Sequence, residues 1–125
     1  MSLNAAGIEL VNFYIQWPKD ATLSLIQYRR LYQTNFSTTP IHEQKRLWSR
    51  ISQGINDDHP DFAPSKRQCR NKWNSLKSGY ENLKRLLDGN PEGFPTHTPT
   101  IHDEYFHEEL SDEFWLTECN CLLFN

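Results

Sequence analysis

The sequence predicts an all-α fold, namely a three-helix bundle with a long third helix and a short acidic helix after it. Two observations carry this prediction. Apolar residues recur with the period of an amphipathic helix in three separate segments, and the third segment starts with a helix-capping sequence. We expect helices near residues 20–34, 40–53 and 66–88 and a shorter helix near residues 100–110. A chain of 125 residues is long enough for one domain with a modest core.

The first predicted helix follows a proline. Residues 8–17, IELVNFYIQW, are apolar and fit either a strand or a helix, and Pro18 ends either one. Asp20 and Thr22 are both candidates for the N-cap of the helix after it. Its inner face is predicted to contain Leu25, Ile26 and Tyr32, with Ala21 or Tyr28.

The second predicted helix lies between a proline and a glycine. Thr39 is the expected N-cap, Pro40 suits the first helical position, and Gly54 is expected to end the helix. Its predicted inner stripe consists of Ile41, Gln44, Leu47, Trp48 and Ile51.

The third predicted helix has the clearest pattern in the chain. Ser65 and Gln68 form the S-x-x-Q capping box, and Gly89 follows the last turn. Apolar residues then recur at intervals of four and three, which places them on one narrow face of a helix. These residues are Cys69, Trp73, Leu76, Tyr80, Leu83 and Leu87.

Charge divides the chain into two unequal parts. All 13 Lys and Arg lie between Lys19 and Arg85, whereas residues 92–125 contain eight acids and no base. Residues 1–91 therefore carry a net charge of +5, from 13 bases and eight acids, although the whole chain is −3. This asymmetry indicates a basic functional surface followed by an acidic appendage. The alternative is that both parts only keep the surface solvated.

Basic and amide side chains gather on the outer side of the third predicted helix. Arg can hydrogen-bond a guanine edge through two donors, and Asn can do the same with adenine. Lysine and the free N–H groups of a first helical turn suit phosphate. The residues concerned are Lys66, Arg67, Arg70, Asn71, Asn74 and Ser78, with Lys77 on the flank.

Three segments in order resemble one known family. They are LIQYRRLYQTNF, LWSRISQGI and PSKRQCRNKWNSLKSGYENLK, and they contain or follow Trp17, Trp48 and Trp73. Together they resemble the trihelix and MADF branch of the Myb/SANT-like domains, whose third helix has the pattern Q-C-R-x-K-W-x-x-L-x-x-x-Y. The resemblance implies a three-helix, helix-turn-helix bundle whose third helix enters the major groove of double-stranded DNA. It covers roughly residues 17–87.

The resemblance also implies a site and a cellular role. The polar positions of the family's third helix correspond to Arg67, Arg70, Asn71, Asn74 and Lys77, to which the helix start adds Lys66. The implied protein is a nuclear transcriptional regulator or chromatin-associated protein. The alternative is a SANT- or MADF-like protein-interaction module that binds a basic partner such as a histone tail.

The same reading divides the chain into three parts. Residues 1–16 are expected to be an N-terminal extension, residues 17–90 the Myb/SANT-like domain, and residues 91–125 an acidic extension with a short helix. We expect the acidic part to modulate binding, either by competing with DNA for the basic helix or by recruiting a basic protein.

Other kinds of chemistry have little support in the sequence. No run of apolar residues is long enough to span a bilayer, and no catalytic or phosphate-loop motif is visible. We therefore expect neither enzymatic activity nor a cofactor. Cys119 and Cys121, with His97, His102 and His107, lack the spacing of a zinc site. Cys69 lies on the apolar stripe, so it is expected to be a buried side chain.

Overall fold

The structure is a computed structural model that describes residues 16–89 and 100–116. Those residues are helical and contain no strand, which confirms the predicted all-α class. In chain order, the elements are α2 (Lys19–Leu31), α3 (Gln33–Thr38), the 3₁₀ turn η1 (Ile41–Glu43), α4 (Lys45–Asp58), α5 (Lys66–Asp88), α6 (Ile101–His107) and the 3₁₀ turn η3 (Phe114–Leu116).

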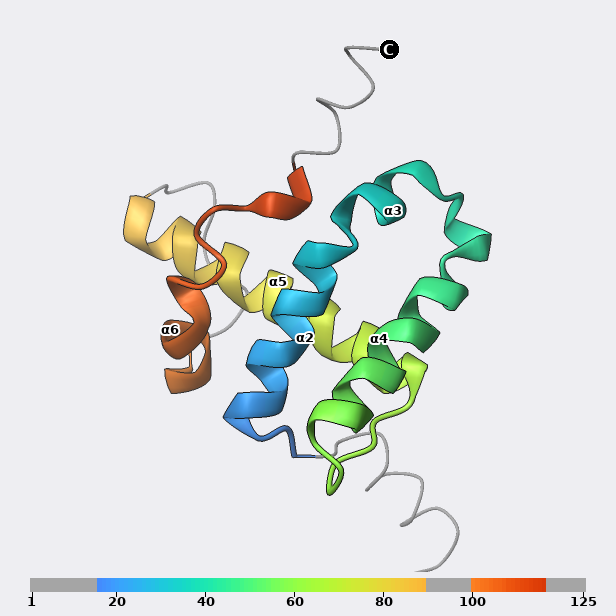
Figure 1. Ribbon diagram of the computed structural model, residues 1–125. Helices are drawn as coiled ribbons and strands as arrows, with labels where there is room; N and C mark the ends of the chain where they lie inside the picture. The colour runs from blue at the N-terminus through green and yellow to red at the C-terminus, as the bar shows by residue number, and fades with distance from the viewer. Residues whose placement is uncertain (1–15, 90–99, 117–125) are drawn as a thin grey trace, which may run out of the picture.

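Helix α5 organises the body of the molecule. It crosses α2 and α4 at its N-terminal half, and α6 lies against it nearer its C-terminal end (Figure 1). Trp73 is 1% exposed, and its ring lies in a cluster with Phe114 and Trp115 of η3 at centroid distances of 5.5 and 5.7 Å. The core therefore includes residues that come after the three predicted helices.

The sequence pattern of α5 is largely confirmed. The Gln68 backbone N–H donates to Ser65 Oγ at 3.1 Å, and the Ser65 N–H donates to Gln68 Oε1 at 2.8 Å, so both halves of the capping box form. Gly89 ends the helix in the left-handed conformation, with φ of 68°. The stripe is buried from Cys69 to Leu83. Leu87 is 65% exposed, so its assignment to the core was wrong, because the last turn of α5 projects beyond the helices that cover the stripe (Figure 1).

The predicted bounds of the second helix were wrong at both ends. Pro40 has extended backbone and precedes η1, so α4 begins only at Lys45. Ile41 lies in η1 and is 84% exposed, which removes it from the predicted core. Gln44 is used to close this turn, because its side-chain amide donates to the carbonyls of Phe36 and Thr39 at 3.0 and 3.1 Å.

Gly54 does not end α4, which continues to Asp58. A Cβ at Gly54 would lie 2.6 Å from Tyr28 Cζ, so the glycine allows α2 to approach α4 closely. The Tyr28 hydroxyl then donates to Asp58 Oδ2 at 2.7 Å. This hydrogen bond is the main reason that the Tyr28 pKa rises to about 12.

The first predicted helix is two helices. Tyr32 departs from helical backbone and separates α2 from α3. Neither Asp20 nor Thr22 caps α2, because the helix begins at Lys19, directly after Pro18. Thr22 instead donates its hydroxyl to the Pro18 carbonyl at 3.0 Å from within the first turn.

The described part of the acidic segment packs on the bundle. Thr100 and Asp103 form a capping box at the start of α6, and Phe106 and Leu110 are each 1% exposed. These residues join the same core cluster as Trp73. The N-terminal extension lies outside the described residues, except for Gln16. None of the described helices has the length and apolar character needed to cross a membrane.

Candidate nucleic-acid interface

A groove of about 610 Å³ runs along the N-terminal half of α5. One wall is α5, and the facing wall comes from α3, η1 and the first turns of α4. The α5 wall consists of Lys66, Arg67, Arg70, Trp73, Asn74 and Lys77. The remaining lining residues are Arg29, Phe36, Ile41, His42, Gln44, Lys45 and Trp48.

The groove brings together five of the six residues predicted to contact DNA. They share a wall because residues 66, 70, 74 and 77 recur at intervals of four, four and three along an α-helix. Asn71 is the member of the predicted set that does not line the groove. Its Cα lies about 100° around the helix from that of Arg70, and its side chain is half-buried.

The groove is strongly cationic. Lys66, Arg67 and Arg70 are exposed on one wall, and Lys45 is exposed on the other. No Asp or Glu occurs among the lining residues, all of which belong to the described part of the chain. Lining side chains of one sign concentrate the field in a groove and favour a polyanion as its occupant.

Aromatic rings and one arginine form the floor of the groove. Arg29 of α2 is 8% exposed, and its guanidinium carbon lies 4.0 Å from the centre of the Phe36 ring and 5.3 Å from that of Trp73. Lys77 reaches over the other part of Trp73, with Nζ 6.0 Å from the ring centre. Phe36 and Trp48 pack beside each other at 5.0 Å. The cations therefore stand on a rigid apolar base.

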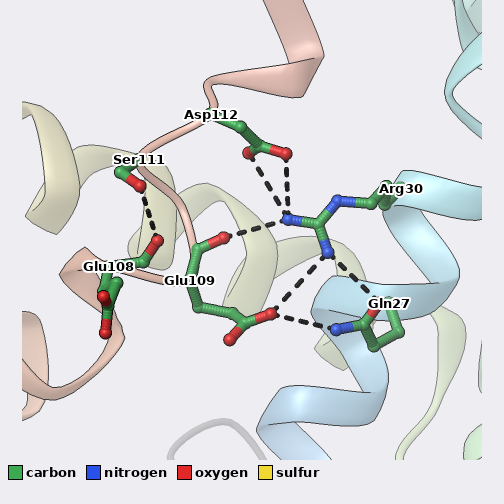
Figure 2. A network of polar contacts seen from close by, with 6 residues as sticks. All are labelled: Gln27, Arg30, Glu108, Glu109, Ser111 and Asp112. Atoms are coloured by element: carbon green, nitrogen blue, oxygen red, sulfur yellow. Dashed lines mark hydrogen bonds and ion pairs between the residues drawn. The ribbon is translucent and has the colours of Figure 1, made fainter.

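Glu109 and Asp112, which follow α6, bind a cation outside the groove. Figure 2 shows Arg30 of α2 held by Asp112 at 3.2 Å and by the Glu109 carbonyl at 3.0 Å. Gln27 donates to the Glu109 carboxylate at 3.0 Å in the same network. These contacts join the segment after α6 to α2.

Glu113 makes a second set of contacts, with the C-terminal half of α5. Its Oε2 accepts from the Lys84 ammonium and from the Tyr80 hydroxyl, both at 2.6 Å. These two hydrogen bonds hold the pKa of Glu113 below its usual value, that from Lys84 being the larger cause. None of these acids lines the groove.

Some groove residues were not anticipated from the sequence. Arg29, His42 and Lys45 come from α2, η1 and α4, and only the tertiary packing sets them opposite α5. Lys45 and its neighbour Arg46 could have been recognised as a basic pair, but Lys45 was expected inside the second helix. Arg29 gives no separate signal, because it lies within an amphipathic segment.

A titratable pair and a buried cysteine lie outside the groove. Lys72 Nζ is 3.0 Å from His102 Nε2, where α6 meets α5. Burial lowers the pKa of both groups, and the nearby charge of Lys72 lowers that of His102 further. Cys69 is fully buried as predicted, and desolvation raises the pKa of its thiol to about 12.

A metal site finds no support in the described residues, where no three His, Cys, Asp or Glu side chains gather. His97, Cys119 and Cys121 of the sequence analysis lie outside those residues.

Comparison with known proteins identifies the family of the chain. The family model described as Myb/SANT-like DNA-binding domain matches residues 15–111, which is more than half of the chain. The match covers the groove and α6 and ends before η3. Neither a curated protein nor a solved structure gives a significant match to this chain.

Proposed function

The chain belongs to the Myb/SANT-like DNA-binding domain family, and from this premise we propose that the cationic groove along α5 is its site for double-stranded DNA. Membership indicates DNA binding, and the family is in general non-enzymatic. Membership alone does not define the surface that binds DNA, the contacts that it makes or the biological setting.

The observation that carries the proposal is the convergence of residues on one groove. Lys66, Arg67, Arg70, Asn74 and Lys77 line it together with Lys45 from the opposite wall, and no carboxylate of residues 16–89 or 100–116 lines it. Exposed lysines and arginines with an amide between them can bind phosphates and base edges at once.

In the proposed complex, the N-terminal half of α5 enters the major groove. Lys66 and Lys77, at the start and on the flank of the helix, would contact phosphates and fix the register. Arg70 and Asn74, between them, would read base edges. Arg67 and Lys45 extend the cationic surface along the two walls. Asn71 does not line the groove. Its predicted contact with a base therefore needs a separate test, by substitution of Asn71 itself.

The biological setting proposed for the domain is regulation of transcription in the nucleus or on chromatin. We place the chain in the trihelix and MADF branch of the family because of the Q-C-R-N-K-W-N-S-L segment that begins at Gln68. The packing of α6 on α5 accords with a bundle that has a helix beyond the first three.

The alternative remains a module that binds a basic protein through its acidic part. Arg30, Tyr80 and Lys84 already engage Glu109, Asp112 and Glu113 within the domain. Glu104 and Glu108 are exposed. A basic peptide that bound Glu109, Asp112 or Glu113 would compete with these internal contacts, which favours DNA as the first candidate.

A salt series on random duplex DNA tests the proposal. If five or six groove cations neutralise phosphates, log K should fall with log salt with a slope of about −4.5 to −5.4. Lys66→Ala should reduce that slope by about one unit for every sequence. Lys19→Ala is the matched control, because Lys19 is exposed on α2 and its ammonium lies over Tyr105. Absence of binding to any duplex at about 50 mM salt, where electrostatic binding is strong, would refute the proposal.

A further inference from the structure

The 3₁₀ turn η3 lies behind the floor of the groove, beyond the residues that the family model matches. Its Phe114 ring stacks on Trp73 with an interplanar angle of 30°, and its Trp115 ring meets Trp73 edge-on at 81°. Phe114 and Trp115 are 6% and 7% exposed. The indole that forms part of the floor is thus supported from below by η3.

Gln33 connects η3 to the arginine of the floor. This glutamine is 8% exposed, and its side-chain nitrogen donates to the Trp115 carbonyl at 3.3 Å. Its side-chain oxygen accepts from an Arg29 guanidinium nitrogen. The same amide therefore binds the turn on one side and orients a residue of the groove on the other.

The acidic side chains anchor η3 from outside. Asp112, two residues before the turn, is paired with Arg30, and Glu113 is paired with Lys84 and Tyr80. The Arg30 guanidinium also lies 4.7 Å from the centre of the Phe114 ring. None of the residues in these contacts lines the groove.

From these contacts we infer that Gln33 is a positioning residue for DNA binding, and that the acidic residues before η3 promote binding by holding the turn against the groove floor. The inference rests on the proposed use of the groove. One of the two expectations from the sequence is that the acidic segment lowers DNA affinity by competing with DNA, whereas this inference has Asp112 and Glu113 raise that affinity. Gln33 acts through Arg29 and Trp73, and the inference requires no contact between Gln33 and DNA.

The first test compares two glutamines in the full chain. Gln33→Leu removes both hydrogen bonds of the connection. Gln53→Leu is the matched control, since Gln53 is exposed on α4 and its side chain donates to Asp57, away from η3 and from the residues that line the groove. Affinity is measured for the duplex that the wild-type protein selects from a random pool and for unselected random duplex, well below the melting temperature of each variant.

Displacement of Arg29 and Trp73 in the floor should lower the affinity for the selected duplex and leave the affinity for random duplex almost unchanged. We expect Gln33→Leu to bind the selected duplex about fivefold more weakly, the equivalent of one hydrogen bond. Binding to random duplex should be nearly unchanged, because phosphate contacts dominate there. A purely structural loss would lower both affinities by the same factor. Equal behaviour of Gln33→Leu and Gln53→Leu would overturn the inference.

Glu113→Gln provides the second variant, in case Gln33→Leu fails to fold. The Glu113 side chain is 23% exposed, and glutamine has nearly the same volume, so the substitution loosens η3 without leaving a cavity. Removal of one negative charge should by itself tighten DNA binding. We expect weaker binding to the selected duplex, because η3 loses the ion pair between Glu113 and Lys84 that helps to hold it. Tighter binding would contradict the inference. Failure of the wild-type protein to bind DNA would refute the proposed function instead.

Discussion

Gly54 offers a sharp test of how α4 packs on α2. Replacing a helical glycine by alanine normally stabilises a protein by about 0.5–1 kcal/mol. Here the added Cβ would lie 2.6 Å from Tyr28 Cζ and 2.9 Å from its hydroxyl oxygen. The ring must therefore move, and its hydrogen bond to Asp58 must lengthen or break. Overpacking of this kind costs about 1–3 kcal/mol, so Gly54→Ala should be destabilising by about 1 kcal/mol net.

A second variant tests whether the Tyr28 ring causes this loss, because without the ring Gly54→Ala should raise the free energy of unfolding. Once Tyr28→Ala has removed the ring, the same Gly54→Ala substitution no longer meets these close contacts and should stabilise by about 0.5–1 kcal/mol. Urea denaturation of the wild-type protein, both single variants and the double variant gives the four free energies of unfolding that this cycle needs. Stabilisation by Gly54→Ala in the presence of Tyr28 would refute the reasoning.

Three further predictions concern single side chains. Trp73→Ala should cost about 3–5 kcal/mol of unfolding free energy, because the ring is 1% exposed; a loss below about 1 kcal/mol in thermal or urea unfolding would contradict its place in the core. In a variant without Cys119 and Cys121, Cys69 should react with a thiol reagent at pH 8 only as fast as the protein unfolds. With a thiol pKa of about 12, roughly one molecule in ten thousand carries the thiolate at that pH. Asn74→Ala should lower affinity for the selected duplex by about 1–3 kcal/mol and Asn71→Ala by less, as a binding titration of both variants would measure; an equal loss would place Asn71 at the bases as well.

Much of α5 could be predicted from the sequence because its signals are local. The capping box of Ser65 and Gln68 and the stripe from Cys69 to Leu83 depend on spacing along one helix, so they do not need the rest of the fold. The all-α class followed from the same periodicity. Five of the six predicted site residues on α5 line the groove, because a helix places its residues on predictable faces.

The ends of the second helix were predicted wrongly because contacts between elements determine them. Gly54 reads as a helix stop in isolation, but close packing against Tyr28 uses it inside α4. Pro40 reads as a first helical residue, but the η1 turn intervenes, and Gln44 closes that turn through Phe36 and Thr39.

The facing wall of the groove and the support from η3 could not be read from the chain. Lys45 and Arg29 reach the groove only after α2 and α4 have packed on α5. Phe114 and Trp115 stand in an acidic stretch without helical periodicity, so composition indicated an appendage rather than part of the core. Asp112 and Glu113 of this acidic stretch pair with Arg30 and Lys84, which explains how the stretch can pack against α2 and α5.

Chemical-shift mapping by NMR tests the use of the groove most directly. Isotope-labelled protein is titrated with the selected duplex, and the side-chain amide signals of Asn74 and Asn71 serve as neighbouring reporters inside and outside the groove. We expect the largest shifts at Asn74, at the backbone amides of residues 66–77 and at residues 41–45 of the facing wall. Shifts concentrated in α6 and residues 108–113, with the groove unchanged, would contradict the assignment of the DNA site.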